Sequence, residues 1–288
     1  MTKSDFKTAI NSGSSLILPG VANPLAALVA ADLGYEALYV TGAGVANTEL
    51  GLPDIGILGL AEMAQAVERI YGAVGLPLVV DADTGYGNAA SAYQAVRRLE
   101  AAGAAAIQIE DQVFPKRCGH FEGKEVVPAA EMVGKIKAAV DARRDEATMI
   151  MARTDAYAIE GYEAAIERAS LYAEAGADIL FVEALTDEEE LRDAPTRNKL
   201  PHLVNVVHGG KTPPLSAAAF GEMGYALVLY ANAALQAAVA GMQTVLGALK
   251  EDGGLGRVED RLAGFVERQR LVRTKEWDAL RARYEDAR

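Results

Sequence analysis

Cysteine is nearly absent from this sequence, since Cys118 is the single one among 288 residues. One thiol excludes a disulfide within the chain and fits a reducing compartment. Positive charge is also scarce: 28 Lys and Arg against 40 Asp and Glu leave a net charge of −12, which argues against binding to a nucleic acid backbone. No apolar run approaches the roughly 18 residues of a membrane span, and the first residues lack the layout of a signal peptide. We therefore expect a cytoplasmic protein with no nucleic acid and no membrane partner.

Short apolar runs alternate with helical patterns along the whole chain. The runs are continuous rather than alternating, which is typical of parallel strands buried on both faces. Eight successive βα units predict an α/β protein with the (β/α)₈ TIM-barrel fold. An open doubly wound sheet is the alternative, but no G-x-G-x-x-G follows the first strand. The expected strands are 15–19, 37–40, 77–81, 106–110, 148–153, 178–183, 202–207 and 225–230.

A glycine pair, Gly253-Gly254, divides the chain into two predicted parts. Residues 1–252 form the barrel, and residues 253–288 form a C-terminal helical extension. We expect one charged helix from Val258 to Ala287, with several apolar side chains among its charges. An exposed apolar stripe needs a partner surface, so this helix either contacts another subunit or packs on its own barrel.

Two carboxylates spaced by one residue, Asp81 and Asp83, follow the apolar run that ends at Val80. They point to the same side if the strand continues through them. Two buried carboxylates at the end of a strand repel each other unless a cation or a proton lies between them. A magnesium ion suits such a pair. The alternative is that the pair caps the next helix, where Asp is common.

Polar side chains end five of the eight predicted strands, at the face where barrel enzymes place their sites. A ring of buried acids is costly without a cation. Because no His or Cys is among the four acids, we expect Mg²⁺, with Mn²⁺ as the second choice. Glu110 could instead cap the following helix, and Arg153 could form a structural ion pair with Glu183. The expected metal ligands are Asp81, Asp83, Glu110 and Asp54.

The loop after the fourth strand, residues 111–127, is longer than a plain connection and is typical of an active-site lid. It contains Cys118 between Arg117 and His120, with Lys116 and Lys124 nearby. Positive neighbours lower the pKa of a thiol, and such a thiol can transfer a proton or act as a nucleophile. The alternative is a buried, inert cysteine.

Four stretches of the chain resemble the isocitrate lyase/phosphoenolpyruvate mutase superfamily. They are residues 81–88, 110–112, 116–124 and 152–155, and the Lys-Arg-Cys-Gly-His loop that begins at Lys116 is the most specific of them. The likeness runs from about Ser15 to Leu249. It implies a (β/α)₈ barrel in a homotetramer, with the eighth helix swapped between subunits.

The resemblance also implies roles for individual residues. Asp81 would hold Mg²⁺, with Asp54, Asp83 and Glu110 acting largely through water. Cys118 matches the cysteine of the lyase branch that protonates the carbanion left after cleavage. The implied catalytic residues are Cys118, His120, Arg153 and Lys116. The implied substrate contacts are Tyr39, Thr41, Gly42, Ala43, Asp81, Arg153, Glu183, Asn205 and His208.

These features together indicate a Mg²⁺-dependent carbon–carbon lyase, an oxo-acid-lyase. Its substrate is expected to be a 2-hydroxy di- or tricarboxylate such as 2-methylisocitrate or 2,3-dimethylmalate, cleaved to an α-keto acid or glyoxylate plus a dicarboxylate. Oxaloacetate hydrolases share much of the motif set, as do mutases and hydrolases of the carboxyphosphonoenolpyruvate or phosphonopyruvate type. These enzymes, and a barrel that only binds a dicarboxylate, are the alternatives.

Two segments depart from the family pattern. His208 stands where relatives commonly carry Glu, and Leu229-Tyr-Ala-Asn232 departs from the usual Tyr-Pro. An imidazole in place of an acid changes the charge at the substrate's far end. His208 therefore faces a substrate carboxylate or phosphonate, or packs against Lys211. We expect the preferred acid to differ from the housekeeping one.

Overall fold

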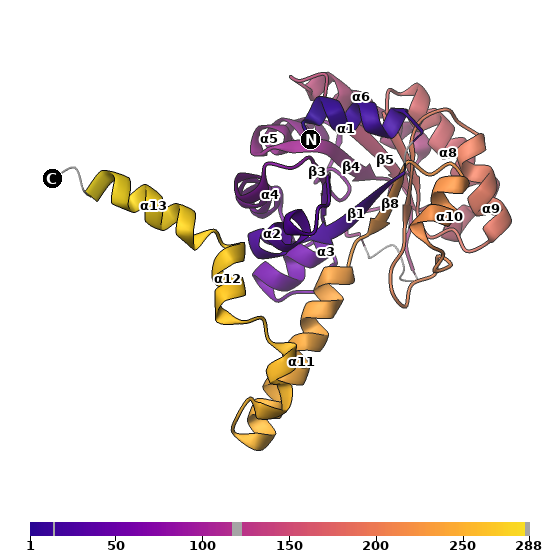
Figure 1. Ribbon diagram of the computed structural model, residues 1–288. Helices are drawn as coiled ribbons and strands as arrows, with labels where there is room; N and C mark the ends of the chain where they lie inside the picture. Colours follow the sequence, from indigo (N-terminus) through magenta and orange to yellow (C-terminus); the bar gives the residue numbers. More distant parts are fainter. Residues whose placement is uncertain (14, 117–122, 286–288) are drawn as a thin grey trace.

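The computed structural model describes residues 1–13, 15–116 and 123–285. Its strands form a closed barrel in which β1 to β8 follow one another in order and all pair in parallel, with helices on the outside (Figure 1). This confirms the predicted (β/α)₈ TIM barrel and excludes the open sheet. The strands are β1 (Leu16–Val21), β2 (Leu38–Val40), β3 (Leu78–Asp81), β4 (Ala104–Glu110), β5 (Met149–Thr154), β6 (Ile179–Val182), β7 (His202–Asn205) and β8 (Leu227–Tyr230). The helices around them are α2 (Pro24–Asp32), α4 (Leu60–Val74), α5 (Ala89–Ala102), α6 (Ala129–Ala142), α8 (Tyr162–Glu174), α9 (Glu188–Asp193) and α10 (Ala217–Glu222).

Helix α5 shows how local sequence sets these boundaries. The Asn88 side chain accepts hydrogen bonds from the backbone N–H groups of Ala90 and Ser91, at 3.0 and 3.2 Å, which makes it the N-cap. The helix ends at Gly103, whose φ of 114° suits glycine. Because Asn88 caps this helix, Asp81 and Asp83 are free for another role.

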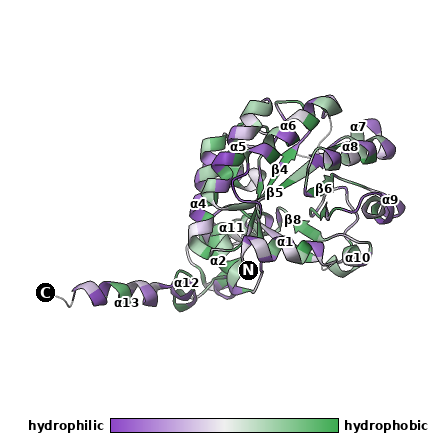
Figure 2. Ribbon diagram, turned by 90° about the horizontal axis from the view of Figure 1, so that it is seen from above, coloured by the Kyte–Doolittle hydropathy of each residue, from purple (hydrophilic) through white to green (hydrophobic). Residues whose placement is uncertain are grey.

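The core has two layers that follow from the barrel. One apolar cluster fills the interior of the barrel, and a larger one lies between the strands and the surrounding helices. Figure 2 shows the hydrophobic strands at the centre and hydrophilic positions on the outward side of the helices. Strands buried on both faces explain the continuous apolar runs in the sequence.

A short N-terminal helix, α1 (Lys3–Asn11), closes one end of the barrel. Its side chains Phe6 and Ile10 are fully buried in the interior cluster. Thr2 and Asp5 form a capping box at its start. In Figure 1, α1 lies at the upper end, and α11 leaves from the opposite end, where the strands finish. The sequence analysis missed α1. Because this helix closes the end of the barrel at which the strands begin, only the end at which they finish is open.

The C-terminal region extends away from the barrel (Figure 1). After α11 (Ala233–Asp252) come the 3₁₀ helix η3 (Gly256–Arg261), α12 (Phe265–Leu271) and α13 (Thr274–Glu285). The prediction of one helix from Val258 to Ala287 is therefore wrong: Gly264 precedes α12, and Arg273 takes a left-handed φ of 57° between the last two helices. No helix of the described ranges is long and apolar enough to cross a membrane.

Contacts of the extension with its own barrel are few. Arg270 of α12 pairs with Asp32 at the end of α2, at 2.6 and 2.7 Å, while Phe265 and Trp277 are 70% and 67% exposed. Packing on its own barrel thus covers only part of the apolar surface of this region. The division of the chain at Gly253 remains a prediction.

A histidine with a perturbed pKa begins β7. His202 is 3% exposed, and its Nε2 has no hydrogen-bond partner within the described part of the chain. The His202 and Tyr225 rings lie nearly perpendicular to each other, with their centroids 6.4 Å apart. Burial lowers the pKa of His202 to about 4, although a hydrogen bond with the Asn198 backbone partly raises it. His202 is thus neutral in the folded protein at pH values where a free imidazole would be charged.

We expect His202 to make folding stability fall with acidity. Its folded pKa of about 4 lies below the unfolded value of about 6.5, so the stabilisation is complete above pH 6.5 and declines as the pH falls towards 4. At pH 5 this linkage removes about 2 kcal/mol. Urea unfolding at pH 7.5 and 5 measures it, and His202→Gln should reduce the difference between the two pH values. The exposed His208→Gln variant is the control and should behave like the wild type.

Candidate active site

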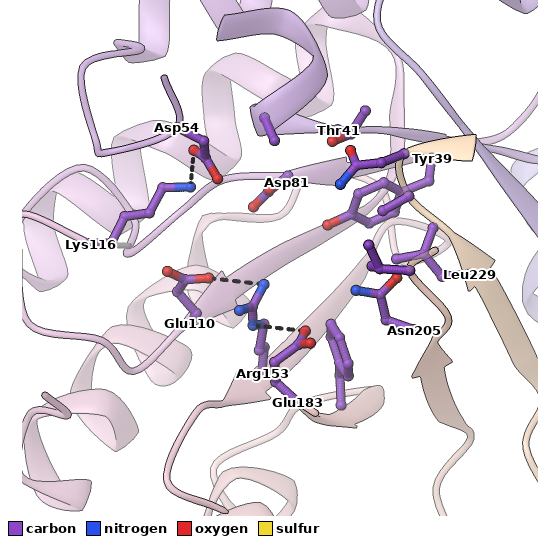
Figure 3. Close-up of a pocket in the computed structure, with 15 residues that line it drawn as sticks. Tyr39, Thr41, Asp54, Asp81, Glu110, Lys116, Arg153, Glu183, Asn205 and Leu229 are labelled. Atoms are coloured by element: carbon purple, nitrogen blue, oxygen red, sulfur yellow. Dashed lines mark hydrogen bonds and ion pairs between the residues drawn. The ribbon is translucent and has the colours of Figure 1, made fainter. Parts of the chain in front are cut away.

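A cavity of about 450 Å³, including the space at its open mouth, lies where the strands end. Seven of the eight strands or the residues just after them contribute to its wall, together with two loop residues, Asp54 and Lys116 (Figure 3). Acidic, cationic, amide and apolar side chains meet there. The wall is formed by Tyr39, Thr41, Ala43, Asp54, Asp81, Glu110, Lys116, Arg153, Phe181, Glu183, Asn205, Val207, Leu229, Ala231 and Asn232.

Asp81, the last residue of β3, is held by three donors. Its Oδ1 accepts hydrogen bonds from the backbone N–H of Asp83 at 3.1 Å and from Nε2 of Gln108 at 3.2 Å, and its Oδ2 accepts one from the backbone N–H of Gly42 at 3.3 Å. Gln108 is in turn fixed by the Tyr39 hydroxyl, which donates to its Oε1 at 2.9 Å. These contacts fix the direction in which the Asp81 carboxylate points.

Asp83 reaches the same region by a different backbone path from the one predicted. β3 ends at Asp81, and Asp83 has a left-handed φ of 46°, so the strand does not continue through it. The two carboxylates converge all the same beside Gly42. A Cβ added to Gly42 would lie 2.9 Å from Asp81 Oδ2 and 3.4 Å from Asp83 Oδ1. Glycine at this position leaves a small space bounded by both oxygens.

Lys116 supplies one positive charge to this cluster. Its Nζ forms ion pairs with Asp54 and, at 2.9 Å, with Asp83 Oδ1. Burial lowers the pKa of Lys116, but Asp83 and its acidic neighbours outweigh that effect and raise it well above its usual value. Burial raises the pKa of Asp83 to about 7, although Lys116 lowers it. One ammonium group therefore does not balance the acids around it.

Arg153, near the end of β5, supplies the second charge. Its guanidinium lies between two acids, 3.3 Å from Glu110 and 3.5 Å from Glu183, and over the Phe181 ring at 5.3 Å (Figure 3). Burial raises the pKa of Glu110 well above its usual value, although Arg153 lowers it. The ion pair between Arg153 and Glu183, which the sequence analysis considered as an alternative, is therefore present, but as part of a larger cluster of charges. Glu110 caps no helix, because Pro128 precedes α6.

Asp155 fixes the orientation of Arg153. Its carboxylate accepts from Arg153 Nε and Nη2 at 2.9 and 3.0 Å, and from Lys124 Nζ at 2.7 Å. Burial raises the pKa of Asp155, but Arg153 and Lys124 outweigh it, so the pKa is lowered overall. Asp111 then accepts from the backbone N–H of Asp155 at 2.9 Å and from the hydroxyl groups of Thr154 and Tyr172, each at 2.7 Å. Two layers of buried carboxylates hold the guanidinium.

The structure brings most of the predicted site residues together. Gly42 does not line the cavity but donates to Asp81, and Asp83 joins through Lys116. His208 is exposed and lies outside the cavity wall, so its contact with substrate remains a prediction. Cys118 and His120 lie outside the described residues.

The sequence analysis missed several residues of the site. Phe181 and Leu229 are interior barrel residues whose apolar character gives no signal of a site. Asn232 lies in a segment already noted as unusual. Asp155 belongs to the 152–155 motif, but its role as the partner of Arg153 depends on geometry.

The acids at the cavity fit a hard divalent cation. Among the described residues, no three acidic, His or Cys side chains lie close enough to surround an ion together. An ion here would therefore have at most two of them as direct ligands, a number that Mg²⁺ tolerates because it keeps several waters. The space beside Gly42 is bounded by two carboxylate oxygens. In addition, Glu110 Oε1 is buried and has no hydrogen-bond partner within the described ranges. The carboxylate oxygens can bind Mg²⁺, and the ion would add positive charge to a cluster in which acids outnumber cations.

Comparison with known proteins agrees with the site. The family model for phosphoenolpyruvate phosphomutase matches residues 6–250. A 2-methylisocitrate lyase of Aeropyrum pernix is 48% identical over 89% of this chain and 82% of its own. A 2,3-dimethylmalate lyase of Eubacterium barkeri is 42% identical over 92% of both chains.

Solved structures of related enzymes share the fold of this chain. A crystal structure of 2,3-dimethylmalate lyase has a TM-score of 0.92 and 36% identity, covering 98% of this chain and 95% of the other. A structure of phosphonopyruvate hydrolase in complex with oxalate and Mg²⁺ has a TM-score of 0.88 and 31% identity, covering 99% of both chains.

Removing the charge of Asp155 should destabilise the fold. In Asp155→Asn, two buried cations, Arg153 and Lys124, lose the carboxylate that they share. Breaking a buried ion pair by removing one partner costs about 3–5 kcal/mol, and urea unfolding measures the loss. The control is Glu163→Gln, which removes an exposed pair with Arg197 and should cost less than about 1 kcal/mol. Equal losses in the two variants would contradict this account of the cluster.

Proposed function

The chain belongs to the phosphoenolpyruvate phosphomutase family, and from that premise we propose that it is a carbon–carbon lyase acting on 2-hydroxy di- or tricarboxylates. The similar proteins named for such acids are 48% and 42% identical to it. The structural observation that carries the proposal is Arg153, buried at the cavity and oriented by Asp155. A guanidinium held in this way presents a fixed charge to a substrate carboxylate.

We propose Mg²⁺ as the metal, with Mn²⁺ as a substitute, held by Asp81 with Asp54, Asp83 and Glu110 acting largely through water. The oxygen donors and the space beside Gly42 support this choice, as does the Mg²⁺ in the similar phosphonopyruvate hydrolase structure. When bound, the ion supplies positive charge that stabilises the negative charge developing on the substrate oxygen.

The chain's own residues then account for the other steps. Arg153 holds a substrate carboxylate, and Thr41, Tyr39 and Glu183 line the space around it. In the cleavage step, the 2-hydroxyl gives its proton to a buried carboxylate of the cavity wall, the C2–C3 bond breaks, and C2 becomes the carbonyl carbon of the keto acid. The electron pair of that bond remains on C3. We propose that Cys118 donates its thiol proton to C3, with Lys116 and His120 as the neighbouring cations that control its ionisation.

The purified protein should cleave at least one hydroxy acid when Mg²⁺ is present. Proton NMR of a panel of 2-methylisocitrate, isocitrate, 2,3-dimethylmalate, citramalate, oxaloacetate and phosphonopyruvate would detect the products. Pyruvate or glyoxylate should appear together with an equal amount of a second carboxylic acid. Turnover of phosphonopyruvate or oxaloacetate alone would contradict the lyase assignment and favour the corresponding branch of the family.

Two controls belong to this assay. EDTA should stop cleavage, and added Mg²⁺ should restore it. Cys118→Ser should lower kcat by more than about 100-fold, the usual contribution of acid–base catalysis, and leave Mg²⁺ affinity unchanged. Full activity of that variant would contradict the role of Cys118.

We further propose a homotetramer in the cytoplasm, in which α11 is swapped between subunits. This helix projects from the barrel and exposes Val239, Met242, Leu246 and Leu249, and an apolar face of this kind needs a partner. Light scattering should give four times the chain mass of 30.4 kDa. The Met242→Glu/Leu246→Glu variant should lower that mass, and Ile159→Glu, exposed on α7 (Tyr157–Glu160), should not. A monomeric wild-type protein would contradict the proposal.

A further inference from the structure

The turn after β3, residues 82–87, has a backbone that needs support from its surroundings. Asp83 and Tyr86 have left-handed φ values of 46° and 58°, and the two glycines of the turn, Gly85 and Gly87, have φ values of 81° and 141°. Left-handed conformations are unfavourable for residues with a side chain, and they persist only where the surrounding structure holds them. Because Asp83 belongs to this turn, whatever holds the turn also places its carboxylate.

Neighbouring elements hold the two ends of the turn. At its beginning, the Ala82 N–H donates to the Gln108 carbonyl of β4 at 2.9 Å. The Glu110 N–H, also of β4, donates to the Asp83 carbonyl at 2.9 Å. At its end, the Asn88 side chain caps α5. The middle of the turn lies between these supports and depends on a third.

A buried lysine of α6, Lys135, provides the third support. Its Nζ donates a hydrogen bond to the Thr84 carbonyl at 3.2 Å. Lys135 and Thr84 are 3% and 1% exposed, and a lysine is rarely buried to this extent unless it is paired. The acid beside it, Glu131, is half exposed and 3.7 Å away, beyond hydrogen-bonding distance. The buried ammonium group is therefore directed at the backbone of the turn.

We propose that Lys135 is a positioning residue for the metal: by holding the Thr84 carbonyl, it keeps the Asp83 carboxylate beside Asp81. This inference rests on the proposed function, because it takes Mg²⁺ to be held by these acids. Asp81 also has donors outside the turn, so loss of the ammonium group should displace Asp83 and leave Asp81 in place. Lys135 does not line the cavity, and it therefore acts through the turn rather than by contact with substrate.

Two measurements on Lys135→Met test the assignment. Methionine keeps the length of the side chain and removes its charge and its hydrogen-bond donor. Binding of Mn²⁺, followed by the paramagnetic resonance signal of the free ion, should weaken about tenfold, as for other residues that orient a metal ligand. In the metal-free protein, the Gly85 N–H, which donates to the Ala82 carbonyl within the turn, should exchange with solvent about tenfold faster. Lys135→Gln, which keeps a donor on a shorter side chain, should show smaller changes of the same kind.

Two control variants separate positioning from a general loss of stability. Lys137→Met changes an exposed lysine on the same helix and should behave like the wild type. Glu100→Met removes a buried carboxylate that accepts from the backbone N–H groups of Arg144 and Asp145, at 3.1 and 3.0 Å, before β5 begins. This variant should be less stable to urea, yet its Mn²⁺ affinity and the exchange rate of Gly85 should match those of the wild type.

Unchanged Mn²⁺ affinity in Lys135→Met overturns the assignment, and so does an equal loss of affinity in Glu100→Met. If Lys135→Met does not fold, Lys135→Gln is judged by the same criteria. A wild-type protein that does not bind Mn²⁺ contradicts the proposed metal, and the exchange rate of Gly85 then decides whether Lys135 holds the turn. If Mn²⁺ binds but no hydroxy acid is cleaved, the lyase function fails, while the two measurements still decide the role of Lys135.

Discussion

Buried negative charge at the mouth of the barrel is the constraint on which the rest of the site depends. Asp81, Asp83, Glu110 and Glu183 are each under 8% exposed, and carboxylates at this depth are tolerated only with cations or bound protons. The ammonium of Lys116 and the guanidinium of Arg153 supply two charges. Burial still raises the pKa of Asp83 to about 7, although Lys116 lowers it. A site with more buried acids than cations favours an added cation. It accepts a substrate carboxylate only where a positive or neutral hydrogen-bond donor is already in place.

Rigid support explains why such a cluster keeps its geometry. Arg153 is held by Asp155, which is held in turn by Asp111 through its backbone N–H. Asp81 is held by Gly42, which follows β2, and by Gln108 of β4. At the other end, Phe6 and Ile10 of α1 fill the barrel with apolar side chains. Because that end is plugged and closely packed, the polar chemistry is confined to the mouth where the strands finish.

The sequence predicted the barrel because its signal is local: each buried strand is an apolar run that ends in polar residues. The same rule found Asp81, Glu110, Arg153, Glu183 and Asn205, which all stand at strand ends. It failed where tertiary packing decides. The backbone turn at Asp83 and the break at Arg273 depend on left-handed φ values, 46° and 57°, which neither Asp nor Arg adopts often enough for the sequence to predict them. The place of Asn232 in the cavity depends on how α11 leaves the barrel, which no local pattern records.

Helix α11 joins the cavity wall to an exposed apolar face. Its first turn stands at the cavity beside Asn232, and its later turns carry the exposed apolar side chains of Met242 and Leu246. A helix is stiff over this length, so a partner that packs against its far end also restrains its N-terminus. Asn232 is therefore positioned both by β8, which precedes it, and by whatever covers α11. Arg153 and Asp81, by contrast, are held by contacts within the barrel, so the geometry of the buried charges does not depend on what covers α11.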